Sequence, residues 1–563
     1  MKRYLRYLAW LLCICIITAS LSSCMTVVRF YGELEGMIGE VLEDETDKGT
    51  DETDSAEPER DLPLDYTLTE ADREEFDRML EVCRSLTIQG TDGDAIDKAW
   101  EALEDHYYHV STQAQIAYIL YCWDQSDEAL SEAYLFASEM ASELYADYMA
   151  LCQEIDTSDS PYRDEFFSDW TEEEIAEMRT YSDALSELYD ANDRILVEFR
   201  ELDDEEFDNR SAELYYQTVL NNNRIATLNG YENYYAYAYD KVYLRDYSTE
   251  DIQALHLLGA TQLVPLFKQA LAEFRANYKR LNSIEQTFLS ALLYSDYDTL
   301  AHNYVKDYID AAPESMKTAM GKMFLPGNSL FTDSESSYAG AFTGMLYEYE
   351  RPFCYFGPGY QSCDTVIHEL GHYYAEQFHI DDSLAMDLAE VHSQGNEMLF
   401  LVFLEDQVSE NVYKTLVSYL LLDMLSTVIL CLIIDEFEML VYQNTDPVNN
   451  PAVHLDTLMD QVVDRYGGRA FLTENIGDPF QYWRFVTIES PVYYVSYAVS
   501  GIAAIELYAV ANEDYDAAMI AYRTLVEEAT PSDGFLAALQ KAGLGSPFES
   551  ATVEKIRALF ARS

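Results

Sequence analysis

Apolar and aromatic residues recur at spacings of three and four along the chain from residue 70 to about residue 310. The spacing is clearest in Ala114–Trp123, Ala129–Leu151 and Leu185–Leu202. Such a pattern places the apolar side chains on one face of an α-helix. Folded structure is expected to begin near Thr67, with Thr69 capping a helix that starts at Glu70. This part of the chain is therefore predicted to be built from amphipathic helices.

Two segments depart from that pattern. Tyr347–Phe356 has the composition of a β-strand and ends at a Gly-Pro-Gly turn. Pro352 lies inside it, which favours a position at the edge of a sheet because proline cannot donate to a strand ladder. Thr415–Ile434 is just long enough to cross a membrane. It contains Asp423 and is followed at once by acidic residues, so a buried core helix is the preferred interpretation.

The N-terminus has the pattern of an export signal. A basic start with Lys2, Arg3 and Arg6 precedes the apolar stretch Tyr7–Leu21. Leu21-Ser22-Ser23-Cys24 resembles a bacterial lipobox, which predicts a signal peptide over residues 1–23 and a lipid on Cys24. The protein is then expected at the outer face of a bacterial cell membrane. An uncleaved anchor and an ordinary signal peptide are the alternatives, and the small residues before Cys24 favour the lipoprotein.

Charge divides the rest of the chain. Between Glu43 and Asp61 ten acidic residues stand against Lys48 and Arg60, so residues 24–66 are predicted to be a disordered acidic linker. The 563 residues carry a formal net charge of −67, which argues against nucleic-acid binding and favours basic peptides as partners. A chain of this length is expected to form at least two further regions. These are an N-terminal helical region over residues 67–205 and a catalytic region over residues 206–563.

The strongest chemical signal is His368-Glu369-Leu370-Gly371-His372. Histidines four apart on a helix project from the same face and can bind one metal ion. Glu369 lies beside the first histidine, where it can take a proton from water held by the metal. Apolar residues flank and interrupt the motif, so the helix is expected to be buried. A buried helix does not hold two histidines without a partner or a ligand.

A third metal ligand has to come from outside the motif. Ala375 and Phe378 stand where a metzincin places glycine and histidine, and His379 is one residue out of register. Glu376 lies too far along the same helix to complete a tetrahedron. Glu390 lies on the next predicted helix, residues 383–405, and can fold back across the first.

These considerations predict a Zn²⁺ site formed by His368, His372 and Glu390, with the fourth position left open. His392 and Glu397 are candidates to orient the ligands by hydrogen bonding. For His392 the alternative of an ordinary core histidine is at least as good.

Three stretches around the motif resemble the oligoendopeptidase F branch of the M3 (thimet oligopeptidase-like) zinc metallopeptidases: Pro352–Tyr360, Asp364–His372 and Ala389–Asn396 with Glu397. Asn222–Tyr234, Asp435–Asn444 and Ser490–Ala498 resemble further segments, in the family's order. The resemblance runs from about residue 200 to the C-terminus. It implies a mainly α fold, a two-lobed helical bowl with a deep substrate channel. A small β element is expected near an HExxH thermolysin-like zinc site.

The resemblance also implies that Tyr494 and Tyr497 support the tetrahedral intermediate as hydrogen-bond donors. One departure stands beside it. The family usually has a histidine shortly before this segment, whereas this chain has none after His454 and reads Trp-Arg-Phe-Val-Thr-Ile there. Arg484 is a candidate replacement donor.

The expected function is a zinc-dependent metalloendopeptidase that hydrolyses oligopeptides, with Glu369 as the general base. The predicted strand near residue 350 is expected to pair with the substrate backbone. A catalytically weak, zinc-containing peptide-binding lipoprotein and carboxypeptidase-like trimming are the alternatives. A bridge between Cys354 and Cys363 is left open.

Overall fold

The computed structural model describes residues 64–562 except 90–92, most of 157–206, 295–298, 380–384, 446–448 and 531–532. The predicted signal peptide, Cys24 and nearly all of the acidic linker lie outside the described residues. So does the predicted boundary between the N-terminal and catalytic regions.

Three antiparallel-packed helices open the described chain: α3 (Glu70–Gln89), α4 (Gly93–Trp123) and α5 (Glu128–Asp156). The helix predicted to start at Glu70 does so. Apolar faces of all three helices meet in a core that contains Phe76, Trp100 and Leu144. A second cluster joins Ile116 of α4 to Tyr355 of the sheet. The N-terminal helices are therefore packed onto the sheet that lies beside the candidate site.

The described chain from residue 207 onward is built around long buried helices. The central ones are α15 (Cys363–Glu376), α16 (Met386–Phe403), α17 (Glu410–Gln443) and α21 (Val495–Ala511), which α8 (Phe207–Leu228) and α11 (Val264–Tyr278) flank. Among the described residues only α17 is long and apolar enough to span a membrane, and 89% of its apolar window is buried inside the protein. The prediction of a core helix for residues 415–434 is therefore confirmed.

The remaining helices and helical turns are α9 (Tyr234–Tyr237), η2 (Ala238–Val242), α10 (Thr249–Leu258), η3 (Gly259–Leu263), α12 (Ser283–Tyr294), α13 (Thr299–Ala311), α14 (Glu314–Gly321), η4 (Lys322–Phe324), η5 (Tyr347–Tyr349), η6 (Leu404–Asp406), α18 (Pro451–Val463), α19 (Arg469–Asn475), α20 (Pro479–Glu489), α22 (Tyr515–Glu527), α23 (Phe535–Lys541) and α24 (Ser550–Arg562).

A three-stranded sheet lies against α15. Its order is β1 (Ser329–Phe331), β3 (Arg351–Phe356), β2 (Ala341–Leu346), with β1 parallel and β2 antiparallel to β3. The prediction of an edge strand over residues 347–356 is wrong in two respects. Residues 347–349 form a 3₁₀ turn, and β3 is the central strand. Pro352 is tolerated because β1 reaches only as far as Cys354, so at Pro352 the central strand has a neighbour on one side only.

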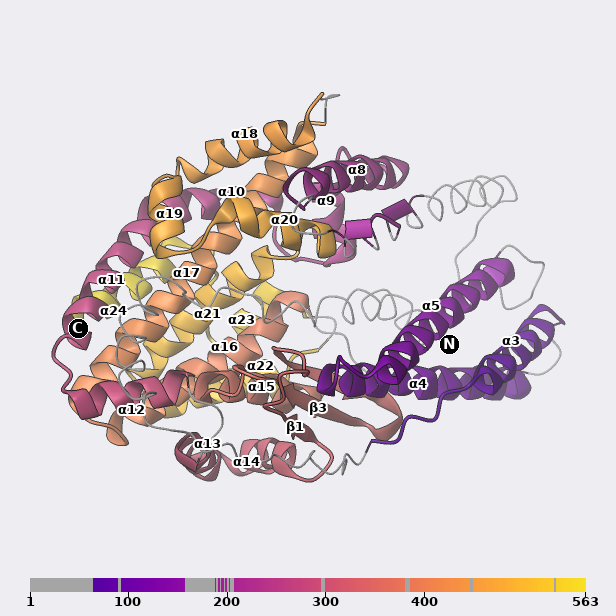
Figure 1. Cartoon of the computed structure of the whole chain (residues 1–563), viewed down its shortest axis with the longest axis horizontal. Coiled ribbons are helices and arrows are strands. Elements are labelled where there is room, and N and C mark those ends of the chain that lie inside the picture. Colours follow the sequence, from indigo (N-terminus) through magenta and orange to yellow (C-terminus); the bar gives the residue numbers. More distant parts are fainter. Residues whose placement is uncertain are drawn as a thin grey trace.

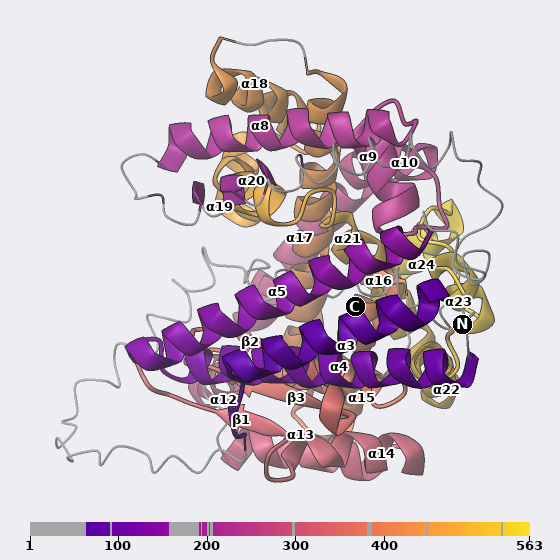
Figure 2. The ribbon, with the colours of Figure 1, turned by 90° about the vertical axis from the view of Figure 1, so that its right-hand side faces the viewer.

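The elements form two helical lobes (Figures 1 and 2). One lobe holds α3, α4, α5, the sheet, α13 and α14, and the other holds α8, α9, α10, α18, α19 and α20. Helices α16, α17 and α21 run between them. The mainly α, two-lobed fold with a small β element is thus confirmed. The candidate site lies on α15, which packs against the sheet, and on α16, which runs between the lobes.

Candidate metal centre

The site begins where α15 and α16 touch backbone to backbone. A Cβ atom placed on Gly371 would lie 2.4 Å from the carbonyl oxygen of His392 and 2.8 Å from the Cα of Ser393. Only glycine allows this approach. A hydrogen bond of 2.7 Å from the amide of Asn396 to the carbonyl of Ile367 joins the same two helices. The close crossing brings Glu390 of α16 to the histidines of α15.

Three side chains converge at this crossing. Their ligand atoms, one each from His368, His372 and Glu390, all lie within 4.8 Å of one another. Glu390 Oε2 is 3.8 Å from His368 Nε2 and 3.7 Å from His372 Nε2. Glu390 is 1% exposed, whereas the histidine side chains are 18% and 14% exposed. The structure therefore brings together the three residues predicted as metal ligands, and the side chains of the two histidines are partly exposed to solvent.

Glu397 orients the first histidine. His368 Nδ1 lies 2.6 Å from Oε1 of Glu397, which is about two turns beyond Glu390 on α16. In the neutral form of the ring, a proton on Nδ1 directed at this carboxylate leaves Nε2, which faces Glu390, free to donate its lone pair to a metal ion. Burial by itself lowers the pKa of His368, but the hydrogen bond and charge of Glu397 outweigh it and raise that pKa to about 9. The carboxylates of Glu390 and Glu397 thus give this cluster a negative electrostatic potential, which favours binding of a cation.

Glu369 points toward the sheet. The Thr343 hydroxyl of β2 donates a 2.7 Å hydrogen bond to Glu369 Oε2, and Cys354 of β3 lies 3.2 Å from that hydroxyl. Burial raises the pKa of Glu369 to about 7, against the opposing effects of His368 and Thr343. A carboxyl group with a pKa near neutrality is suited to accept and return a proton. Nothing in the sequence near residue 343 marked this partner.

His392, the other candidate for orienting a ligand, contacts α22 instead. Its Nε2 lies 3.3 Å from the carbonyl of Leu525, and its own carbonyl accepts a 2.7 Å hydrogen bond from Tyr522. Burial first, and neighbouring histidines second, lower the pKa of His392 to about 3. His392 is therefore a neutral core histidine, the alternative that the sequence favoured at least equally.

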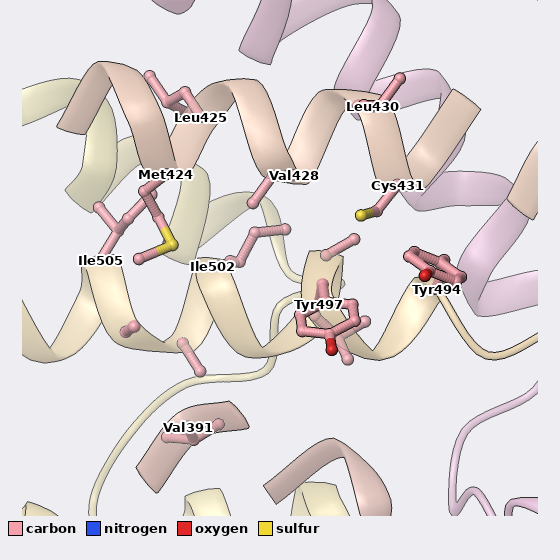
Figure 3. Packing of buried hydrophobic residues seen from close by; sticks show 14 of the residues in the cluster. Val391, Met424, Leu425, Val428, Leu430, Cys431, Tyr494, Tyr497, Ile502 and Ile505 are labelled. Atoms are coloured by element: carbon pink, nitrogen blue, oxygen red, sulfur yellow. The ribbon is translucent and has the colours of Figure 1, made fainter. Parts of the chain in front are cut away.

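Tyr494 and Tyr497 lie at the start of α21, a helix that packs along α16. Both are buried, with 1% and 2% exposure, in the cluster shown in Figure 3. There Tyr494 lies beside Cys431 of α17, and the Tyr497 hydroxyl points away from α17. Their ring centres are 5.7 Å apart. The two tyrosines thus begin a helix that packs along α16, and both are held inside the core.

Arg484 and the cysteine pair Cys354 and Cys363 are the remaining candidates from the sequence. Arg484 donates to the carbonyl of Phe480 and, at 3.0 Å, to Asp456 of α18. Its described contacts therefore do not place it at the metal centre as a replacement for the absent histidine. Cys354 and Cys363 are both free thiols, so the bridge left open by the sequence is not formed.

No family model matches the chain, and no curated protein matches it either. Solved structures do. A chain described as an oligoendopeptidase F from Bacillus anthracis str. Ames is 16% identical, with a TM-score of 0.63 over 90% of this chain and 98% of that one. Pz peptidase A, solved with an inhibitor, is 17% identical, with a TM-score of 0.62 over 89% and 99%. Trypanosoma cruzi metallocarboxypeptidase 1 is 12% identical, with a TM-score of 0.53 over 87% and 100%.

This chain has the oligoendopeptidase F fold. At these identities the likeness establishes the fold alone. The matches cover 99% and 98% of the two neighbouring peptidase chains. What the chain does with that fold depends on its own residues.

Proposed function

We propose that this protein is a zinc-dependent metalloendopeptidase that hydrolyses oligopeptides. The proposal depends on one observation above all, the convergence of His368, His372 and Glu390 beside the buried carboxyl of Glu369. A cluster of this kind costs the folded state stability unless a ligand compensates its buried polar groups. Its occurrence in the oligoendopeptidase F fold supports a peptidase rather than a structural role.

The donor set fits zinc. Ligand bonds of about 2.0–2.1 Å in a tetrahedron place donor atoms about 3.3 Å apart. The carboxylate oxygen of Glu390 is already 3.7 and 3.8 Å from the two histidine nitrogens. Bound zinc supplies Lewis-acid polarisation of a carbonyl and lowers the pKa of a coordinated water to about 7. His368, His372 and Glu390 would hold the ion, and the hydrogen bond to Glu397 would fix the orientation of the His368 ring.

Glu369 is the proposed general base. Thr343 occupies its Oε2, which leaves Oε1 to accept a proton from the attacking water and deliver it to the leaving amine. Thr343 lies on β2, one of the two edge strands of the sheet beside α15. A peptide that pairs along β2 would present its backbone next to Glu369. The substrate-pairing strand is thus proposed to be β2 instead of β3.

Tyr494 and Tyr497 are proposed to donate hydrogen bonds to the oxyanion of the tetrahedral intermediate. Both rings are buried here, so this role requires the tyrosine segment to face the peptide in the bound state.

Residues 1–23 are proposed to be a signal peptide, and Cys24 is proposed to carry a lipid at the outer face of a bacterial membrane. Loss of labelled palmitate incorporation in Cys24→Ala would support the anchor, and unchanged incorporation would refute it.

The decisive experiment is cleavage of a mixed peptide library by wild type and Glu369→Gln, with and without a zinc chelator, read by mass spectrometry. We expect chelator-sensitive internal cleavage by wild type and a rate about 10²–10⁴-fold lower in the variant. Zinc content of both proteins, measured by elemental analysis, is the control. Equal cleavage rates with equal zinc content would refute the proposal.

Two alternatives have an observation of their own. The missing histidine before Ser490, together with Arg484 turned toward Asp456, favours a catalytically weak zinc-containing peptide-binding lipoprotein. Peptide binding without chelator-sensitive cleavage would establish it. The likeness to a metallocarboxypeptidase favours carboxypeptidase-like trimming. Peptides with blocked C-termini would resist trimming but would still be cut by an endopeptidase.

A further inference from the structure

Arg245 is a buried cation that the chemistry described above does not use. Its side chain is 1% exposed and lies between the rings of Tyr239 and Tyr243, each centred 4.4 Å from the guanidinium carbon. A desolvated guanidinium against aromatic faces is favourable. Its Nη2 donates to the carbonyls of Val492 (3.0 Å) and Tyr493 (3.4 Å). It also reaches the hydroxyl of Ser496 at 3.1 Å.

The other side of the same guanidinium faces the metal-bearing helix. Arg245 Nε is 3.6 Å from Asp387 Oδ1, and Asp387 lies on α16 one turn before Glu390. Burial by itself lowers the pKa of Arg245, but Tyr247 and Asp387 beside it raise the pKa above its ordinary value, so the group stays charged. A single buried cation therefore joins the helix of Glu390 to the segment that contains Tyr494 and Tyr497.

The backbone of that segment is strained. Val492 has a φ of +63°, a left-handed conformation that is rare for any residue other than glycine and a true outlier for a β-branched one. Its side chain is fully buried. Tertiary contacts hold both polar groups of this residue. Its N–H donates at 2.9 Å to Glu438 of α17, and its carbonyl accepts from Arg245.

Strain of this kind persists only where the surroundings impose it, and it is concentrated at functional sites. Buried charges are likewise poor sources of stability, because apolar residues of similar volume serve as well or better. Here a buried acid and a buried arginine together fix one strained turn. Tyr494 follows Val492 by two residues and is the N-cap residue of α21.

We propose that Arg245 and Glu438 are positioning residues, which hold the strained turn at Val492 and thereby fix Tyr494 and Tyr497 relative to the helix that bears Glu390. This inference rests on the proposed peptidase function. The contacts of Arg245 and Glu438 with the Val492 turn, called the Val492 tie below, come from residues far from the tyrosines in sequence. It supplies a fixed geometry in a chain whose tyrosine segment lacks the expected upstream histidine.

The test compares Arg245→Lys with a matched control, Arg484→Lys, in the full-length zinc-loaded protein. Arg484 is also buried and also binds a carbonyl, a carboxylate and an aromatic face, but these contacts lie on α18 and α20. With one fluorogenic peptide from the cleavage library as substrate, we expect kcat to fall about 10- to 100-fold in Arg245→Lys. KM should stay within about threefold and zinc content should be unchanged. Arg484→Lys should keep kcat within about twofold.

Glu438 gives a second pair of variants that does not bury an unpaired charge. Glu438→Gln keeps an acceptor for the Val492 N–H and should retain most of kcat, whereas Glu438→Leu removes it and should lower kcat as Arg245→Lys does. Equal kcat in Leu and Gln variants, or an equal fall in both arginine variants, would overturn the proposal. So would a fall in Arg245→Lys that merely follows zinc loss.

Hydrogen exchange of the same proteins separates this inference from the proposed function. We expect faster exchange in Arg245→Lys at residues 490–497, and unchanged exchange in α8 and α18. If wild type cleaves no peptide, the peptidase proposal fails. Hydrogen exchange at residues 490–497 then decides by itself whether the Val492 tie holds that segment. Unchanged exchange at residues 490–497 would overturn it.

Discussion

Gly371 and His392 are so close that no side chain fits between them: a Cβ on Gly371 would lie 2.4 Å from the His392 carbonyl oxygen. This contact sets the separation of the helix that carries two proposed metal ligands from the helix that carries the third. The glycine of the HExGH motif therefore has a steric role of its own. It permits the crossing that brings Glu390 to the histidines.

Gly371→Ala should therefore push α16 away from α15. Because backbone atoms cannot give way as a flexible side chain can, we expect a loss of about 1–3 kcal/mol in the free energy of unfolding. Zinc affinity should weaken as well, measured by competition with a chromogenic chelator. Gly321→Ala is the control, since a Cβ there has nothing within 4 Å. Equal stability and zinc affinity in the two variants would show that the crossing does not depend on Gly371.

Thr343→Val should lower kcat about tenfold with zinc content unchanged, because it removes the hydroxyl that holds Glu369 Oε2 and leaves a buried carboxyl group with one partner fewer. Thr343→Ser keeps the hydroxyl and should recover most of the rate. Steady-state kinetics of the three proteins on one peptide make the comparison. A valine variant as fast as wild type would remove Thr343 from the proposed catalytic arrangement.

Glu397→Gln should weaken zinc binding about 10- to 100-fold, since a carboxylate that accepts from a ligating histidine raises its basicity and fixes its ring. Glu376→Gln provides the comparison on the neighbouring helix. Glu376 is half-buried, one turn beyond His372, and has no polar partner among the residues that the structure describes. The zinc affinity of the Glu376→Gln variant should match that of the wild type. Equal affinities for all three proteins would contradict the proposed role of Glu397.

Chelation should destabilise the whole protein. A ligand present at 100 times its Kd stabilises the state that binds it by about 2.7 kcal/mol, so removal of zinc should lower Tm measurably. His372→Ala should start with a lower Tm and show no further fall on chelation. A chelator-insensitive Tm in wild type would show that no metal is bound to the native state.

The predicted helices follow from local spacing, and the structure confirms them where it describes them. The helix from Glu70 and the buried core helix over residues 415–434 both needed only the order of apolar and polar residues. Strand order was a different matter. Pro352 argued for an edge strand, yet β3 is central because β1 is too short to reach the proline.

The sequence alone determined that His368 and His372 share one helix face, since residues four apart on a helix project from the same face. It also singled out Glu390 as their partner, because His379 is out of register and Glu376 lies too far along the same helix. Only the tertiary structure decided what holds these groups. Thr343 beside Glu369, and Arg245 between Asp387 and the Val492 turn, join segments far apart in the chain. Contacts of that kind have no periodicity, because packing fixes them and local spacing does not.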